Sequence, residues 1–194
     1  MSAHNEIPLS NVFPYPIIDI EASGLQSRSH PIEVAVVTAD NRRYEALLRP
    51  LPEWTHWDEE AERLHGISRE RLEKEGTDIR LVCAKLNDLC WRQTLYSDCW
   101  TYDSRWLHFL FAAAGMPMKF RCSALETVLT ENEWLQWHER KRRCHEALRL
   151  PAHRAMNDAF AIAVTVDQML SERAIFRNDR NDRSAALRRA GAGL

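Results

Sequence analysis

The sequence predicts an α/β domain built around a mixed β-sheet of five strands with helices on its faces. Three strand-like segments follow one another in the first quarter of the chain, and helical and strand-like patterns alternate after residue 58. Strands joined by short turns become antiparallel neighbours, whereas strands separated by helices tend to pair in parallel. The chain has 194 residues, of which 45% are hydrophobic, so it can bury the core of one such domain.

The first strand begins at Ile17 and carries two acids, Asp19 and Glu21, between aliphatic residues. Successive side chains of a strand point to opposite faces, so both carboxylates project from one face while Ile18 and Ile20 face a core. Like charges held side by side repel each other, so the pair suggests a bound cation. A cation held by acids usually needs more than two ligands, which directs attention to acids elsewhere in the chain.

Two further strands are expected at residues 32–38 and 43–48, where aliphatic and β-branched residues dominate. The short turn at 39–42 would join them as an antiparallel hairpin. The sequence Pro50-Leu51-Pro52 then ends the run of strands, because proline cannot continue a hydrogen-bonded ladder.

Helical periodicity governs the remainder of the chain, interrupted by two short strand-like runs. Ser68 and Ser123 are expected to cap helices, and Gly115 with Pro117 to stop one. Helices are expected at 58–64, from 68, and at 77–91, 104–114, 124–137 and 152–170, with strands at 93–97 and, weakly, at 119–122.

The domain is expected to span residues 15–176, between an N-terminal extension at 1–14 and a tail at 177–194. Asn, Asp, Arg and small residues dominate the tail, which predicts a flexible end or a short surface helix. Residues 1–10 lack the basic start and apolar block of a signal peptide, and no stretch approaches the ~20 apolar residues of a membrane span. A cytoplasmic location without membrane contact is therefore expected.

Charge and cysteine content restrict the possible partners. The chain has 26 basic and 28 acidic residues and a net charge of -2, so it does not bind nucleic acid through bulk positive charge, although a local basic surface is compatible with these numbers. The five cysteines form no CxxC pair with a second pair of ligands. We expect reduced thiols rather than a structural zinc site.

Two more acidic clusters follow the first strand. Asp103 lies where the fourth strand passes into a helix, a position at which an aspartate also serves as an ordinary N-cap. His153 precedes Asp158 by five residues, about 500° of helical rotation, so the two would diverge on one regular helix. We expect His153 at the helix entrance and Asp158 about a turn later. A surface histidine and a first-turn aspartate that suits the helix dipole are the alternative interpretations.

The clusters together supply four carboxylates and one titratable base: Asp19, Glu21, Asp103, Asp158 and His153. Four hard oxygen ligands suit Mg²⁺ or Mn²⁺ and suit zinc poorly.

In these clusters the sequence resembles the DEDDh exonucleases. The segment Asp19-Ile20-Glu21-Ala22-Ser23-Gly24-Leu25 matches the first motif of that family, Asp103 the second, and His153-Arg154-Ala155-Met156-Asn157-Asp158-Ala159 the third. Residues 32–35 and 64–67 are also similar to family segments. Many relatives carry a His-Asn pair ahead of the second-motif aspartate, where this chain has Asp98-Cys99.

The resemblance implies a ribonuclease H-like fold, with strands one to three antiparallel and strands four and five parallel to the first. It implies two Mg²⁺ or Mn²⁺ ions bridged by Asp19, with Glu21 and Asp158 completing one site and Asp103 supporting the other. His153 would be the general base that takes a proton from the attacking water.

The activity implied is 3′-to-5′ exonucleolytic release of nucleoside 5′-monophosphates from single-stranded DNA or RNA. Ala22 and Ser23 would meet the terminal 3′-hydroxyl and Leu25 would lie beside the last base. His65 and Trp106 are further candidates for contact with the nucleotide. His65 is equally explained as a histidine at a helix C-terminus, and Trp106 as a residue packed beneath its helix. Relatives include dimers, so the resemblance admits a homodimer.

Other interpretations remain open at this point. A catalytically inactive nucleic-acid or protein-binding module of the same fold is one alternative, and a phosphoesterase acting on very short oligonucleotides is another. The basic run Arg140-Lys141-Arg142-Arg143 could lead a phosphate chain to the metals or be a solvated helix face. Trp134 and Trp137, three residues apart, are interpreted as a core stripe rather than as stacking platforms.

Overall fold

The computed structural model describes residues 12–191, with side chains to residue 177, so most of the predicted N-terminal extension lies outside it. Its centre is a five-stranded sheet in the order β3-β2-β1-β4-β5. The strands are β1 (Ile17–Ala22), β2 (Pro31–Val37), β3 (Arg43–Leu47), β4 (Thr94–Ser97) and β5 (Arg121–Ala124). The first three are antiparallel, β4 is parallel to β1, and β5 is parallel to β4, as the ribonuclease H-like prediction requires.

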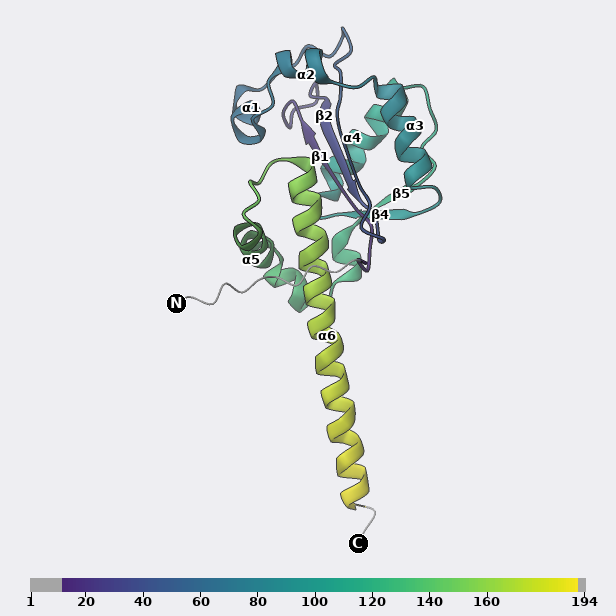
Figure 1. Cartoon of the computed structure of the whole chain (residues 1–194), viewed down its shortest axis with the longest axis vertical. Helices are drawn as coiled ribbons and strands as arrows, with labels where there is room; N and C mark the ends of the chain where they lie inside the picture. Colours follow the sequence, from purple (N-terminus) through teal and green to yellow (C-terminus); the bar gives the residue numbers. More distant parts are fainter. Residues whose placement is uncertain (1–11, 192–194) are drawn as a thin grey trace.

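Helices cover both faces of this sheet (Figure 1). One long helix, α6, packs against β1, β2 and β3, while α4 packs against β1, β2 and β4 from the other side, next to α3. The helices are α1 (Glu59–His65), α2 (Arg69–Glu75), α3 (Ile79–Leu89), α4 (Trp100–Ala113), α5 (Glu131–Leu148) and α6 (Ala155–Gly191), with a short 3-10 turn at Leu125–Val128.

The two faces of β1 belong to two hydrophobic cores. Ile18 and Ile20 pack with residues of α3 and α4, whereas Ile17 packs with residues of α5 and α6. The alternation of a strand therefore places Asp19 and Glu21 on the side of α5 and α6. The prediction that both acids share a face, opposite the buried isoleucines, is confirmed.

The entrance to α4 differs from the prediction. The helix begins at Trp100 instead of residue 104, and its N-cap position is Cys99. Ser97 explains the earlier start, because its hydroxyl accepts a hydrogen bond from the Cys99 N–H at 3.0 Å and turns the chain directly after β4. Asp103 consequently lies inside the first turn, and its interpretation as an N-cap was wrong.

The prediction was also wrong about the start of α5. Ser123 does not cap a helix, because it lies in β5 and pairs with Tyr96 of β4. The helix begins later, at Glu131, after a capping box in which Thr130 and Glu133 exchange side-chain and main-chain hydrogen bonds. Trp134 and Trp137 do form a core stripe, with their rings stacked 6.0 Å apart and Trp137 fully buried.

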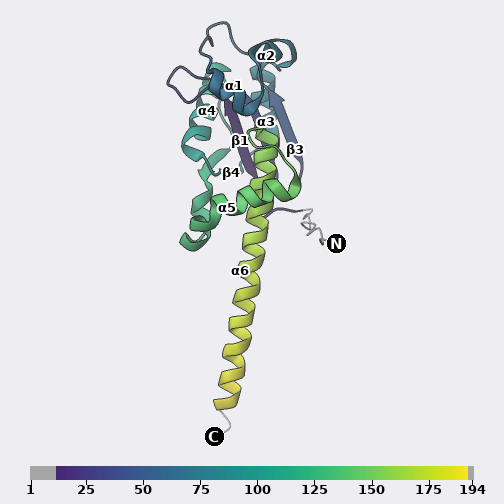
Figure 2. The same ribbon diagram turned by 90° about the vertical axis from the view of Figure 1, so that its left-hand side faces the viewer.

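Helix α6 is longer than the predicted 152–170. It continues to Gly191, and its lower half projects away from the sheet (Figures 1 and 2). The predicted tail at 177–194 thus continues this helix as far as residue 191, and its flexibility stays a prediction. Within the described residues, no helix is both long and apolar enough to cross a membrane.

Candidate metal centre

Three carboxylates from two elements meet at the end of β1. Asp19 and Glu21 extend from β1, and Asp158 extends from the first turn of α6. One ligand oxygen of each lies within 4.8 Å of those of the other two, a spacing at which a single cation can contact all three. The fold thus brings together the first strand and the last helix, whose acids the sequence had assigned to one site.

Asp103 is the fourth acid of the predicted set and lies deeper. Its side chain is 2% exposed and accepts a hydrogen bond from the Ser97 hydroxyl. Burial, together with the charges of Asp98 and Glu21, raises the pKa of Asp103 to about 8. Asp103 in turn acts on Asp19, whose pKa is raised well above its usual value by burial and by the charges of Asp103 and Asp158.

The electrostatics of the cluster fit a divalent cation. Burial and then the charge of Asp158 raise the pKa of Glu21 to about 7. Carboxylates that oppose each other's ionisation are relieved by a positive ion between them. The donors are oxygen atoms only, which Mg²⁺ and Mn²⁺ prefer. The residues present therefore fit the metal that the sequence implied.

Asp158 differs from the other acids because it is held by two partners. Its Oδ2 accepts a hydrogen bond from the Arg154 N–H at 3.1 Å, and its Oδ1 lies 3.1 Å from His145 Nε2 of α5. Burial would raise its pKa, but the hydrogen bond from His145, followed by the charges of His145 and Lys141, holds the pKa of Asp158 below its usual value. Asp158 is therefore a fixed, readily ionised member of the cluster.

His153 lies on the loop before α6, with Asp158 one turn into the helix, as the spacing predicted. It is exposed and borders the same cavity as the acids. Its φ of 61° is in the left-handed region, which non-glycine residues seldom occupy. Such backbone conformations persist where the surroundings enforce them, often at functional sites.

The surroundings that hold this loop include a partly buried ion pair, between Arg154 and Glu33, that sequence reasoning missed. Glu33 of β2 is 2% exposed and lies opposite Glu21 in the β1–β2 ladder. It accepts hydrogen bonds from Arg154 Nη2 at 2.7 Å and from the Ala155 N–H at 2.9 Å. Glu33 thereby fixes the first residues of α6 to the sheet, next to His153.

Two residues on the α5 side of the cavity, Asp98 and Lys141, were not singled out as site residues, although the sequence placed Lys141 in the basic run at 140–143. Lys141 Nζ lies 2.5 Å from Asp98 Oδ2, and Trp137 Nε1 donates to the same oxygen at 2.9 Å. Lys141 and Asp98 border the cavity together with the four acids. A sequence signal existed, because Lys141 continues the stripe of Trp134 and Trp137 at helical spacing, where a charge is unexpected on a core-facing row.

The cavity has a volume of about 350 Å³, within the range of sites that bind small ligands. Ala22 and Leu25 lie on its wall, and Leu25 is 65% exposed at the rim. The chain reaches Leu25 through Gly24, whose φ of 142° and close approach to Asp58 suit glycine alone. Leu25 is thus an accessible apolar side chain beside the carboxylates.

The other three residues predicted to contact the nucleotide, Ser23, His65 and Trp106, are more buried than Leu25. Ser23 is fully buried, accepts a hydrogen bond from the His30 N–H and does not border the cavity, in contrast to Ala22 and Leu25. His65 borders the cavity, but it also ends α1, and its Nδ1 accepts a hydrogen bond from the Ile67 N–H. Trp106 is 1% exposed and belongs to the core under α4, with part of its side chain on the cavity wall.

The basic run at 140–143 divides into two parts. Its three arginines bind acids on the outer surface: Arg140 binds Glu172, Arg142 binds Glu139 and Glu146, and Arg143 binds Glu139. Lys141 alone of the four borders the cavity. The three arginines therefore form a solvated helix face. Of the four basic residues, only Lys141 lies where it could contact a phosphate in the cavity.

Fold and site together define an α/β domain of the ribonuclease H-like fold with an acidic pocket at the end of its first strand. No protein-family model matches the sequence, and no curated protein matches it significantly. Solved structures do resemble it. Exonuclease I of E. coli in complex with a dT13 oligonucleotide aligns with 85% of this chain at 13% identity and a TM-score of 0.60.

A zinc-bound complex of E. coli exonuclease I with single-stranded DNA aligns with 84% of the chain at 14% identity, with a TM-score of 0.59. Exonuclease I of Methylocaldum szegediense, a moderately thermophilic form, aligns with 81% at 15% identity and a TM-score of 0.54. At these identities the likeness establishes the fold. The matched region spans 42%, 42% and 40% of the three neighbours' own chains.

Proposed function

We propose that this chain is a metal-dependent exonuclease that removes nucleoside 5′-monophosphates from the 3′ end of single-stranded nucleic acid. The observation that carries the proposal is the cluster of Asp19, Glu21 and Asp158, with Asp103 behind it and His153 at the rim of one cavity. The likeness of the fold to exonuclease I bound to oligonucleotides supports the proposal.

The four acids would hold two Mg²⁺ or Mn²⁺ ions. Bound there, the cations would neutralise charge on the scissile phosphate and make a water molecule a stronger nucleophile. Asp19 lies among the other three acids, since the charges of Asp103, Asp158 and Glu21 all act on it. That position supports its assignment as the ligand shared between two ions.

His153 would accept the proton of the attacking water. It lies on the cavity rim near Asp158 but is not tied into the carboxylate cluster, so it can reach water and then release the proton to solvent. Leu25, exposed at the cavity rim, would pack beside the terminal base, a contact that is tolerant of base identity.

The test compares wild type with Asp19→Ala on labelled single-stranded DNA, single-stranded RNA and duplex of matched sequence, each in Mg²⁺, Mn²⁺ or chelator. We expect release of monophosphates from a single-stranded 3′ end, dependent on the metal and absent in Asp19→Ala. Binding of ends without any metal-dependent release would instead support the inactive module. A length series of oligomers separates an enzyme of very short substrates from one that acts on long chains.

A further inference from the structure

Among the four residues of the basic run at 140–143, Lys141 alone directs its charge toward the cavity. The side chain of Lys141 is 24% exposed, compared with 56% for Arg142 and 71% for Arg143. It lies one turn after the fully buried Trp137 and one turn before His145, which contacts Asp158. This face of α5 is turned toward the carboxylate cluster.

Lys141 is held in place by Asp98. The Asp98 side chain is 6% exposed. Its Oδ2 accepts hydrogen bonds from Lys141 Nζ and from the indole N–H of Trp137. An ammonium has three N–H donors, and the hydrogen bonds of the described residues use one of them. The remaining donors are available to a ligand in the cavity that Lys141 borders.

A partly buried ion pair contributes little net free energy to folding, because the desolvation of both charges offsets much of their attraction. The charge of Lys141 also acts beyond its partner. Burial lowers the pKa of Lys141, but the charge of Asp98, followed by those of Asp19 and Asp158, raises it above its usual value. A phosphate that enters this pocket meets five carboxylates, of which only Asp98 is paired with Lys141, and the fixed ammonium on the α5 wall supplies attraction that the acids do not.

We propose that Lys141 binds a non-bridging phosphate oxygen of the nucleic acid, within the last two linkages of its 3′ end, and that Asp98 and Trp137 orient it. The restriction to the last two linkages follows from the position of Lys141, which borders the same cavity as the acids that would act on the terminal linkage. The inference rests on the proposed function for its substrate class. It also gives a role to Asp98, at the position where the chain differs from the His-Asn pair of the family it resembles.

The first experiment measures oligonucleotide affinity by fluorescence anisotropy, with Ca²⁺ as the cation to limit cleavage. Lys141→Met keeps the length of the side chain and removes its charge, and Arg143→Met is the matched control on the same helix. We expect Lys141→Met to weaken binding at least tenfold and to lower the slope of log affinity against log salt by about 1. Arg143→Met should change neither quantity, and equal behaviour of the two variants would overturn the proposal.

Removing Lys141 alone leaves Asp98 buried without its cation, so stability must be separated from binding. The double variant Asp98→Asn with Lys141→Met removes both charges and keeps an acceptor for Trp137 Nε1. If the proposal is correct, this variant binds as weakly as Lys141→Met. Recovery of wild-type affinity in the double variant would overturn it.

The second experiment locates the phosphate. Oligonucleotides carry one uncharged methylphosphonate linkage, moved stepwise from the 3′ end. At one of the last two linkages, neutralisation should weaken wild-type binding and have no further effect on Lys141→Met. Independent, additive losses at every linkage would contradict a direct contact.

The two proposals fail separately. If wild type cleaves no substrate but the coupling between Lys141 and one linkage persists, the exonuclease proposal fails and Lys141 remains a phosphate-binding residue. If wild type cleaves in an Asp19-dependent manner and the coupling is missing, only the assignment of Lys141 fails.

Discussion

At the scale of single residues, the backbone of His153 is the feature that most needs an explanation. A histidine with a φ of 61° is held in a conformation that costs on the order of 1 kcal/mol, and the Glu33–Arg154 pair next to it provides the restraint. The result is an imidazole that stays at the rim of the acidic cavity. That placement agrees with a role in proton transfer better than with a role as a metal ligand.

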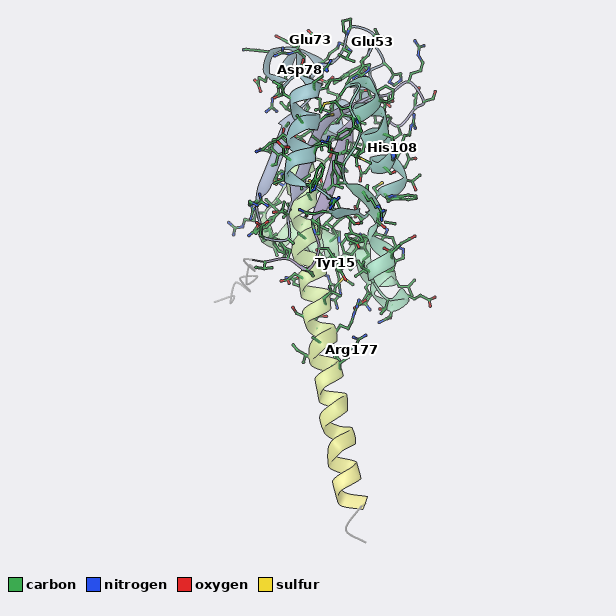
Figure 3. The ribbon with its side chains drawn as sticks, turned by 90° about the vertical axis from the view of Figure 1, so that its right-hand side faces the viewer. Tyr15, Glu53, Glu73, Asp78, His108 and Arg177 are labelled. Atoms are coloured by element: carbon green, nitrogen blue, oxygen red, sulfur yellow. The ribbon has the colours of Figure 1, made fainter. Side chains whose placement is uncertain are left out.

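His153→Ala should therefore separate chemistry from metal binding. We expect Mn²⁺ affinity measured by calorimetry to stay within about twofold of wild type, because the four acids are unchanged, while hydrolysis falls by roughly 10² or more. Unchanged turnover would show that His153 is not the base. His108→Ala on the exposed outer side of α4 (Figure 3) is a control that should leave both quantities unaltered.

Asp19→Asn should stabilise the metal-free protein. The Asp19 carboxylate is destabilised by burial and by Asp103 and Asp158, so its replacement by a neutral amide relieves repulsion. We expect the free energy of unfolding in chelator, measured by urea titration, to rise by roughly 1 kcal/mol. Added Mn²⁺ should then raise the stability of wild type and not of Asp19→Asn. A destabilised variant that still responds to Mn²⁺ would contradict the assignment of Asp19.

The sequence identified some residues of the candidate site and not others, for a physical reason. Asp19 and Glu21 were identifiable because strand alternation fixes their common face, whereas His153 and Asp158 were assigned only jointly with the other acids and by their match to the third motif of the family that the sequence resembles. Whether Lys141 and Glu33 lie at the site depends on how α5 and α6 pack against the ends of the strands. Periodicity along one element does not encode such a contact between elements.

At the scale of elements, the entrance to α6 depends on β2. Glu33 accepts hydrogen bonds from Arg154 and from the Ala155 N–H, so a strand side chain takes the place of a helix cap. This bond fixes the distance between the β1 acids and Asp158, because Glu33 lies opposite Glu21 in the ladder. The cluster of acids is thus assembled by the attachment of α6 to the sheet.

Glu33→Gln should weaken that attachment. The substitution keeps the size of the side chain but leaves the Arg154 guanidinium without its carboxylate, and we expect a loss of about 2 kcal/mol in the free energy of unfolding. Mn²⁺ affinity should fall as well, because Asp158 is less well placed. The matched control is Glu73→Gln (Figure 3), which removes an exposed i,i+4 pair with Arg69 and should cost less than about 0.5 kcal/mol. Equal losses in the two variants would show that Glu33 is not an anchor.

The errors in element boundaries have a related origin. Ser97 starts α4 early through a side-chain bond to the Cys99 N–H, and pairing with β4 draws Ser123 into β5. Both outcomes depend on contacts between elements or within a turn, which a window of hydrophobic periodicity does not detect. Where an element carries its own signal, as in the hairpin of β2 and β3, the prediction was confirmed.

At the scale of the whole molecule, α6 has two parts with different surroundings. From Ala155 to Met169 it supplies buried side chains to the core shared with β1, β2 and α5. Further along, Arg173 binds Glu133 of α5, whereas Ile175 and Phe176 are 62% and 67% exposed. Arg177 lies where the helix has already left the body of the domain (Figure 3).

A chain that stops after Arg177 should therefore keep the fold and the site. The α6 residues buried in the described part of the helix and the Arg173–Glu133 pair are retained, so we expect the free energy of unfolding to change by less than about 1 kcal/mol and Mn²⁺ affinity to be unchanged. A chain that stops after Asp167 is the contrasting truncation, because it also loses the buried Met169 and the link from Arg173 to α5. It should lose several kcal/mol, since one buried methionine alone contributes about 2 kcal/mol or more. If the chain ending at Arg177 were as unstable as the one ending at Asp167, the projecting half of α6 would have to be part of the folded unit, and the domain boundary near residue 176 would be wrong.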